Sequence, residues 1–385
     1  MKKILMIPGP VEYEHDVLAA MSRPTYAHTS REFTEIFQRA LENTMKIFGA
    51  KEGLPFVIAG SGTLAMEIAT VNFIKRDSSV LVVSTGYFGD RFVDLLSRFA
   101  KKVDVYRTPL GRPADPKEVY ERASKGGYDL VTVTHVDTST GVRNNVKEIA
   151  NYFRDLDTIL VVDGVCSIGG EEFSMEWGAD VAFTASQKAL GTPPGLAVGV
   201  VGPKALKAME RVQPLTFYSD LRKWRDVLNS YMQGKAAYFA TPAVNLIYAL
   251  DASLNSILNE GLDNRVRRHE VVAESIRAAI RSLGLKMMPE EGAYANTISV
   301  QFLPEMVKQS SFLSDAERFG AVFAGGLVPE IKERYFRIGH MGSITASEVL
   351  IAVGAIERAL KKNGYDVDLG KGIAAAEEVL FKNGL

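Results

Sequence analysis

Cysteine is almost absent from this sequence: Cys166 is the single one among 385 residues. One cysteine excludes a disulfide bond within the chain, which agrees with a reducing compartment. Long apolar runs are also missing, and none approaches the length that a helix needs to cross a bilayer. The opening "MKKILMIPGP" has only a short apolar run before Pro-Gly-Pro, too short for the core of a signal peptide. We therefore expect a cytoplasmic protein.

The sequence has no surplus of charge of either sign, with 45 lysine and arginine residues against 46 aspartate and glutamate residues. This balance gives no reason to expect nucleic acid or an anionic membrane as a partner. The five histidines show no spacing typical of metal ligands, and neither HExxH nor CxxC occurs. We therefore predict no metal site. Hydrophobic residues make up 46% of the chain, enough for a large core.

Short apolar runs alternate with helix-like segments through the first two thirds of the chain. These runs are nearly continuous rather than alternating, which is typical of strands buried on both faces of a parallel sheet. The predicted strands are 55–60, 79–86, 102–107, 129–136, 158–165, 180–185 and 196–202. The spacing of Leu64, Ile68 and Val71 predicts a helix over 62–74. This rhythm predicts a large, doubly wound α/β domain with a mainly parallel sheet.

The rhythm breaks at residues 212–240, which are aromatic and irregular and are predicted to form a functional or interfacial loop. Thr241 and Pro242 suit the N-cap and first position of a helix that ends near Gly261. After a second helix, the remainder reads as a smaller α+β domain. The expected helices and strands there are 263–282, 296–302, 314–320, 334–342, 344–362 and a docking helix in the tail. We expect an N-terminal segment at 1–15 that contributes to the active site, a large domain at 16–260 and a small domain at 261–385.

Several predicted strand ends carry polar groups that each have an ordinary explanation. Asp163, after a buried strand, suits a core ion pair, Ser61–Gly62–Thr63 suit a helix start, and Thr138–Ser139–Thr140 suit a turn. Lys188 in "TASQKALGTPPG" suits a surface charge. Together they offer a carboxylate, an anion cup, a row of hydroxyls and an amine at one edge of a sheet. That combination predicts a site for pyridoxal phosphate, with Lys188 as the amine that bonds its aldehyde.

The motifs "GSGTLAMEIA", "TGYFGDR", "DTSTGV", "VVDGVCSIGG", "SQKALGTPPGLA" and "YFAT" carry a resemblance along nearly the whole chain. The sequence resembles the class V (fold type I) pyridoxal-phosphate-dependent aminotransferases, and within them the alanine–glyoxylate and serine–pyruvate group. The resemblance implies a large cofactor-binding domain and a smaller C-terminal α+β domain. It also implies a homodimer whose active sites are shared between subunits.

The same resemblance implies roles for individual residues. Lys188 would hold the cofactor and move the proton, Asp163 would bond the ring nitrogen, and Thr138 would bond the ring hydroxyl. Phe88 would stack on the ring. The cofactor phosphate would be held by Ser61, Gly62, Thr63 and Gln187, and by Tyr238 and Thr241 of the neighbouring subunit. Arg337 would bind the substrate carboxylate beside the backbone of Gly9, although by pattern alone this strand arginine would face solvent.

The expected reaction moves an amino group from alanine or serine to glyoxylate or pyruvate by a ping-pong mechanism. A donor such as aspartate, or phosphonopyruvate as a partner substrate, stays open, because Arg31, Arg91 or Arg222 can line the side-chain pocket. A catalytically silent subunit that keeps the fold is a second alternative. Cysteine desulfurases share the fold but need an exposed reactive cysteine. Cys166 follows a buried strand closely and suits the core instead.

Overall fold

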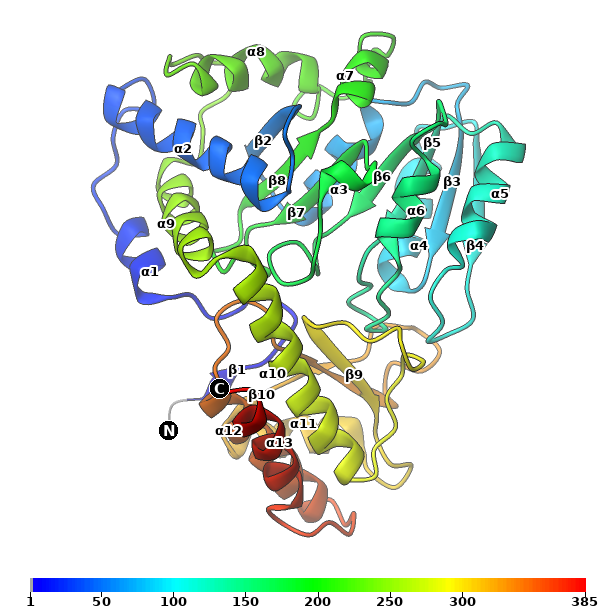
Figure 1. The fold of residues 1–385 in the computed structure, drawn as a ribbon, viewed down its shortest axis with the longest axis vertical. Helices are drawn as coiled ribbons and strands as arrows, with labels where there is room; N and C mark the ends of the chain where they lie inside the picture. Colours follow the sequence, from blue (N-terminus) through cyan, green and yellow to red (C-terminus); the bar gives the residue numbers. More distant parts are fainter. Residues whose placement is uncertain (1–2) are drawn as a thin grey trace.

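The computed structural model describes residues 3–385, and a seven-stranded sheet forms the centre of the larger domain (Figure 1). All strands point the same way except β8, which is antiparallel to both of its neighbours. Across the sheet the order is β2 (Leu54–Ala59), β8 (Leu196–Val201), β7 (Val181–Ala185), β6 (Ile159–Asp163), β5 (Leu130–Thr134), β3 (Ser79–Ser84) and β4 (Lys102–Arg107). The predicted doubly wound, mainly parallel sheet is confirmed.

Helices cover both faces of this sheet. In the view of Figure 1, α3 and α4 lie behind the strands and α6 lies in front of them. This alternation follows from right-handed crossovers between parallel strands. The helices of this part are α1 (His15–Met21), α2 (Arg31–Ile47), α3 (Gly62–Val71), α4 (Tyr87–Leu96), α5 (Pro116–Gly126), α6 (Val146–Tyr152), α7 (Pro203–Met209), α8 (Leu221–Met232) and α9 (Val244–Glu260), with a 3-10 turn at Met175–Trp177.

Two expectations for residues 212–261 are wrong. The segment expected to be an irregular loop contains α8, whose first turn is capped by Asp220 through the N–H of Arg222. The buried face of α8 has a helical spacing that its aromatic composition masks. Helix α9 begins at Val244 rather than beside Thr241, because Ala243, with ψ of 76°, stands outside the helical region as its N-cap.

The smaller domain is built from the two ends of the chain. Strand β1 (Ile4–Leu5) pairs in parallel with β10 (Ala321–Val322), so the N-terminal segment joins the C-terminal part. Beside them stands an antiparallel sheet in the order β11 (Ala324–Gly325), β12 (Tyr335–Gly339), β9 (Ile298–Phe302). The helices are α10 (Leu262–Ser282), α11 (Gln309–Arg318), α12 (Ala346–Lys362) and α13 (Lys371–Lys382), and α13 packs on α10. This domain has its own apolar core.

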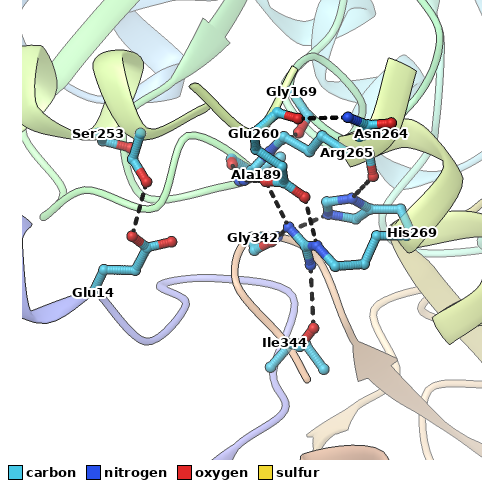
Figure 2. A network of polar contacts seen from close by, with 12 residues as sticks. Glu14, Gly169, Ala189, Ser253, Glu260, Asn264, Arg265, His269, Gly342 and Ile344 are labelled. Carbon is cyan, nitrogen blue, oxygen red and sulfur yellow. Dashed lines mark hydrogen bonds and ion pairs between the residues drawn. The ribbon is translucent and has the colours of Figure 1, made fainter. Parts of the chain in front are cut away.

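Helix α10 begins where the two domains meet, and its first turns hold them together (Figure 2). The buried guanidinium of Arg265 donates to the carbonyl oxygens of Gly169 and Ala189 in the larger domain, at 2.7 and 2.8 Å. One turn along α10, the ring of His269 accepts the N–H of Gly342, just beyond β12. The loop that follows β7 is therefore tied to the smaller domain. Within residues 3–385, no helix is long and apolar enough to cross a membrane.

Candidate active site

The carboxyl ends of five parallel strands meet at one edge of the large sheet, and a cavity of about 230 Å³ opens there. Strands β2, β3, β5, β6 and β7 point the same way, so the loops that follow them converge. The sequence-predicted residues that line this cavity are Ser61, Gly62, Thr63, Phe88, Thr138, Asp163, Gln187 and Lys188. The fold thus brings together polar groups that lie more than a hundred residues apart in the chain.

Asp163 is the last residue of β6, and its side chain is buried. Its carboxylate accepts the N–H of Val165 at 2.9 Å, and no cation of residues 3–385 lies within ion-pair distance. Burial, and next the charge of Asp137, raise the pKa of Asp163 to about 7, against the attraction of Lys188. A buried carboxylate without a cation is costly unless a ligand supplies one.

Lys188 stands in the turn that follows β7, with its amine inside the protein. The Nζ atom donates a hydrogen bond to the carbonyl oxygen of Pro8, from the N-terminal segment. Burial lowers the pKa of Lys188, which favours the neutral, nucleophilic amine. Gly9 lies against the same side chain: a Cβ atom there would come within 2.8 Å of Lys188 Cδ. The N-terminal segment therefore forms a wall of the site, and only glycine fits at that position.

The start of α3, where the sequence predicts a phosphate cup, is an open helix N-terminus. Ser61 is the N-cap residue of this ten-residue helix, and its side chain makes no capping hydrogen bond. The first N–H groups of α3 therefore point toward the cavity with their positive helix end. Beside them, Gln187 Oε1 is buried without a hydrogen-bond partner. Thr134 Oγ1, which the sequence reasoning missed, lines the cavity in the same unpaired state.

Phe88 and Arg91 stand together on α4 beside the cup. The guanidinium carbon of Arg91 lies 4.9 Å from the centre of the Phe88 ring, and Arg91 Nη1 donates to Thr63 Oγ1 at 3.3 Å. Of the three arginines considered for the side-chain pocket, Arg91 lines the cavity. Arg31 pairs with Glu35 on the surface, and Arg222 pairs with Asp220.

Arg337 occupies the middle of β12 and is only 8% exposed, so the solvent-facing reading of its pattern is wrong. Its Nε atom donates to the carbonyl oxygen of Gly325 at 2.7 Å. Its Nη1 atom donates to the carbonyl oxygen of Thr138 at 3.2 Å, across the boundary between the domains. The guanidinium therefore reaches the loop that also carries a cavity-lining hydroxyl. A planar, bidentate cation placed there suits a substrate carboxylate.

Tyr238 and Thr241 do not line the cavity of their own chain. Tyr238 is 64% exposed, and its ring lies 5.4 Å from that of His28. The prediction that both residues act on a neighbouring subunit stays a prediction. Cys166 is 1% exposed, belongs to the apolar cluster between the domains and also lines the cavity. Burial raises the pKa of its thiol, which suits a packing role better than a nucleophilic one.

The groups around the cavity fit pyridoxal phosphate, the cofactor expected from the sequence. A carboxylate without a cation suits the protonated nitrogen of a pyridine ring, and an open helix N-terminus suits a phosphate. The unpaired oxygen of Gln187 and hydroxyl of Thr134 leave polar atoms that only a ligand or water satisfies. The amine of Lys188 suits an aldehyde. Among residues 3–385 no cluster of histidine, cysteine or acidic side chains suits a metal ion.

Comparisons with known proteins show what the whole chain is similar to. The sequence profile described as "Aminotransferase class-V" matches residues 10–315. Alanine–glyoxylate aminotransferase 1 of Saccharomyces cerevisiae is 40% identical over 88% of this chain and 91% of the yeast protein. The L-aspartate–glyoxylate aminotransferase of Paracoccus denitrificans is 36% identical over 97% of this chain and 95% of its own. The crystal structure of ureidoglycine–glyoxylate aminotransferase from Bacillus subtilis has a TM-score of 0.93 and 26% identity, covering 99% of this chain and 98% of that one.

Proposed function

The chain belongs to the class-V aminotransferases, and from that premise we propose that it transfers the amino group of alanine or serine to glyoxylate or pyruvate. It is a pyridoxal-phosphate-dependent transaminase. The observation that carries the proposal is the meeting of Lys188, Asp163 and the α3 N-terminus at one cavity, with Arg337 beside it. A silent subunit of this fold would need neither a buried lysine with a lowered pKa nor a buried arginine beside the site.

Each residue has a distinct task in this reaction. Bound pyridoxal phosphate supplies an electron sink for the substrate carbon that loses its proton. Asp163 would hold the proton on the ring nitrogen, and Phe88 would pack against the ring. Arg337 binds the carboxylate of each substrate in turn. Lys188, whose pKa is lowered by burial, takes the proton from the substrate α-carbon and returns it.

A single carboxylate-binding residue explains why the two substrates take turns. The amino donor and the oxo acceptor each carry a carboxylate, and one Arg337 serves both half-reactions. Release of the first product must therefore precede binding of the second substrate. Between these two events the bound cofactor would hold the amino group, which makes the kinetics ping-pong. Glyoxylate appears in the names of the yeast, Paracoccus and Bacillus relatives, whereas the donors differ. This supports glyoxylate as acceptor and leaves the donor as the property to measure.

We favour a small donor because the arginine nearest the cavity is already occupied. Arg91 rests on the ring of Phe88 and donates to Thr63, so its position supports the cofactor rather than a second substrate carboxylate. Aspartate as donor is the alternative, because Arg91 is the one of the three candidate arginines that lines the cavity.

The visible spectrum of the purified protein tests this function directly. Loaded with pyridoxal phosphate, it is expected to be yellow, to bleach with L-alanine or L-serine, and to regain colour with glyoxylate. Bleaching by L-aspartate but not by L-alanine or L-serine would mean that aspartate is the donor. A yellow protein that ignores every amino acid would favour the silent subunit. A protein that binds no pyridoxal phosphate would overturn the proposed function.

We also propose that the enzyme is a homodimer with shared sites. Large apolar side chains beside the predicted cross-subunit residues are exposed: Leu215 is 59%, Phe217 70% and Tyr238 64% exposed. Exposed large apolar side chains of this kind support a surface that another chain covers. Mixing Lys188→Ala chains with Tyr238→Phe/Thr241→Ala chains tests the sharing. Each inactive parent is expected to restore activity in the other, and verified heterodimers without activity would contradict it.

A further inference from the structure

The loop that follows β5 contains a buried carboxylate to which no role has yet been given. Asp137 is 0% exposed. Its Oδ2 atom accepts the N–H groups of Phe88 and Gly89, at 3.1 and 3.3 Å. Its Oδ1 atom accepts the N–H and the hydroxyl of Ser139, at 2.9 and 2.6 Å. Every neighbour within hydrogen-bond distance is therefore a donor, and only an acceptor fits between them.

Together with Ser139, Asp137 caps a helix that has no cap of its own. The N-cap residue of α4 is Gly86, which has no side chain to offer. The N–H of Tyr87 is instead accepted by Ser139 Oγ at 2.9 Å. The carboxyl of Asp137 also lies at the positive end of α4; burial raises its pKa, and the hydrogen bonds from Ser139, Gly89 and Phe88 oppose that shift. A Cβ atom at Gly86 would come within 2.5 Å of Ser139 Oγ, so the close approach of the two loops requires glycine there.

Three groups of the active site depend on this capped turn. The backbone N–H of Phe88, on the first turn of α4, donates to Asp137 Oδ2. Thr138 lies between the two capping residues, and its side chain lines the cavity. The carbonyl oxygen of Thr138 accepts Arg337 Nη1, which comes from the smaller domain. The ring that covers the cofactor and the cation that binds the substrate carboxylate are therefore attached to the same short segment.

We propose that Asp137 is a positioning residue, which through the turn 137–139 sets the places of the Phe88 ring, the Thr138 hydroxyl and the Arg337 guanidinium together. This inference rests on the proposed function. It adds that cofactor affinity and substrate-carboxylate binding are set by one buried carboxylate outside the cavity lining. Loss of its acceptor atoms frees α4 at its first turn and the Thr138 carbonyl at the same time. Both properties are then expected to change in one variant.

Asp137→Asn tests this inference, because it keeps the shape and turns an amide NH₂ toward two of the donors. In the variant loaded with pyridoxal phosphate, we expect the cofactor dissociation constant to rise about ten- to hundredfold. The circular dichroism of the bound cofactor is expected to change, since it reports the orientation of the ring. The KM values for L-alanine and glyoxylate are expected to rise together by about tenfold. Ser139→Ala keeps the Asp137 carboxylate but leaves the N–H of Tyr87 unpaired. It is expected to change the dissociation constant, the dichroism and the KM values in the same direction as Asp137→Asn, by smaller amounts.

Asp180→Asn is the matched control, because Asp180 is also a buried aspartate, 7% exposed, at the opposite edge of the sheet. It is expected to lower the melting temperature and leave the dissociation constant, the dichroism and both KM values unchanged. The inference is overturned if Asp137→Asn behaves like Asp180→Asn in these readouts. Should Asp137→Asn not fold, wild-type values for Ser139→Ala would overturn it instead. If the wild-type protein itself binds no pyridoxal phosphate, the proposed function fails, and that result is distinct from these.

Discussion

The amino and carboxyl ends of the parallel strands form two opposite edges of the central sheet. Each edge has a buried aspartate, and the two aspartates differ in their partners. Asp180, just before β7, accepts the N–H of Leu160 at 2.8 Å and pairs with Lys204 at 2.9 Å. Asp163, at the far end of the neighbouring strand β6, accepts one backbone hydrogen bond, and no cation among residues 3–385 lies within ion-pair distance of it. At the first edge Lys204 neutralises Asp180, whereas at the second edge the cation that would neutralise Asp163 must come from a ligand. An unpaired charge in a stable fold thus marks the functional edge.

Lys188→Ala is expected to have the largest effect on turnover, because it removes the proton carrier at the carboxyl ends of the strands. Turnover is expected to fall by about a thousandfold or more, since a general base typically contributes that much. The protein is expected to remain folded, because burying the Lys188 amine costs desolvation free energy and the variant no longer has that cost. Steady-state kinetics and the absorbance of bound cofactor measure this, with Lys204→Met as control. Wild-type turnover would contradict the proposed role of Lys188.

Asp163→Asn is expected to have the next largest effect. Without the carboxylate the ring nitrogen loses its proton, and turnover is expected to fall by about a hundredfold or more. The same variant has a signature in stability. The pKa of Asp163 rises from 3.8 to about 7 in the folded protein. Between those values the folded protein holds a proton that the unfolded chain releases, so the free energy of unfolding falls as pH rises.

Urea unfolding of the cofactor-free protein between about pH 4 and 7 measures this slope, which reaches at most about 1.4 kcal/mol per pH unit for one proton. The slope is expected to be smaller in Asp163→Asn, and in wild-type protein after addition of pyridoxal phosphate, which brings the missing cation. Equal slopes in the wild type and Asp163→Asn would show that this carboxyl does not titrate in the window.

Arg337→Lys sharpens the contrast from the side of the smaller domain. A lysine keeps the charge but offers no planar fork, so the KM values for both substrates are expected to rise by about tenfold. The change in kcat is expected to be smaller, because the arginine binds a group that does not react. Initial rates with each substrate varied in turn measure this. A rise for only one substrate would mean that the two carboxylates bind at different places.

Lys204→Met is expected to have the smallest effect on the reaction. It leaves Asp180 without its cation, and the free energy of unfolding is expected to fall by about 1–2 kcal/mol, since Lys204 is partly exposed. Turnover and cofactor affinity are expected to match the wild type. Urea unfolding and steady-state kinetics on the same preparation measure both. A loss of turnover would mean that the two edges of the sheet are not independent.

The sequence predicts the elements of the large domain well, because nearly continuous apolar runs and polar strand ends are local signals. The order of strands across the sheet and the reversed direction of β8 were not predictable, since they depend on pairing between distant segments. The same limit applies to Asp137. In sequence it looks like a turn residue, and its burial follows from β3 lying next to β5.

Arg337 shows a different limit. Alternation predicts that it faces solvent, because Phe336 and Ile338 are apolar on either side. That rule assumes a sheet with one wet face. In β12 all five residues are buried, so the arginine points into the protein between the domains. The resemblance to the family predicts a role for Arg337 inside the protein, whereas the periodicity of the strand does not.

The N-terminal segment has a consequence for how the protein is made. Ile4 pairs with Ala321, and Pro8 and Gly9 close over Lys188. During synthesis, residues 4–9 leave the ribosome long before their partners, Lys188 and Ala321, leave the exit tunnel. The large sheet can form while synthesis continues, but the wall over the lysine waits until almost the whole chain is available. We therefore expect Lys188 to stay uncovered in the growing chain until Ala321 is available. The catalytic pocket is then closed in one of the last steps of folding.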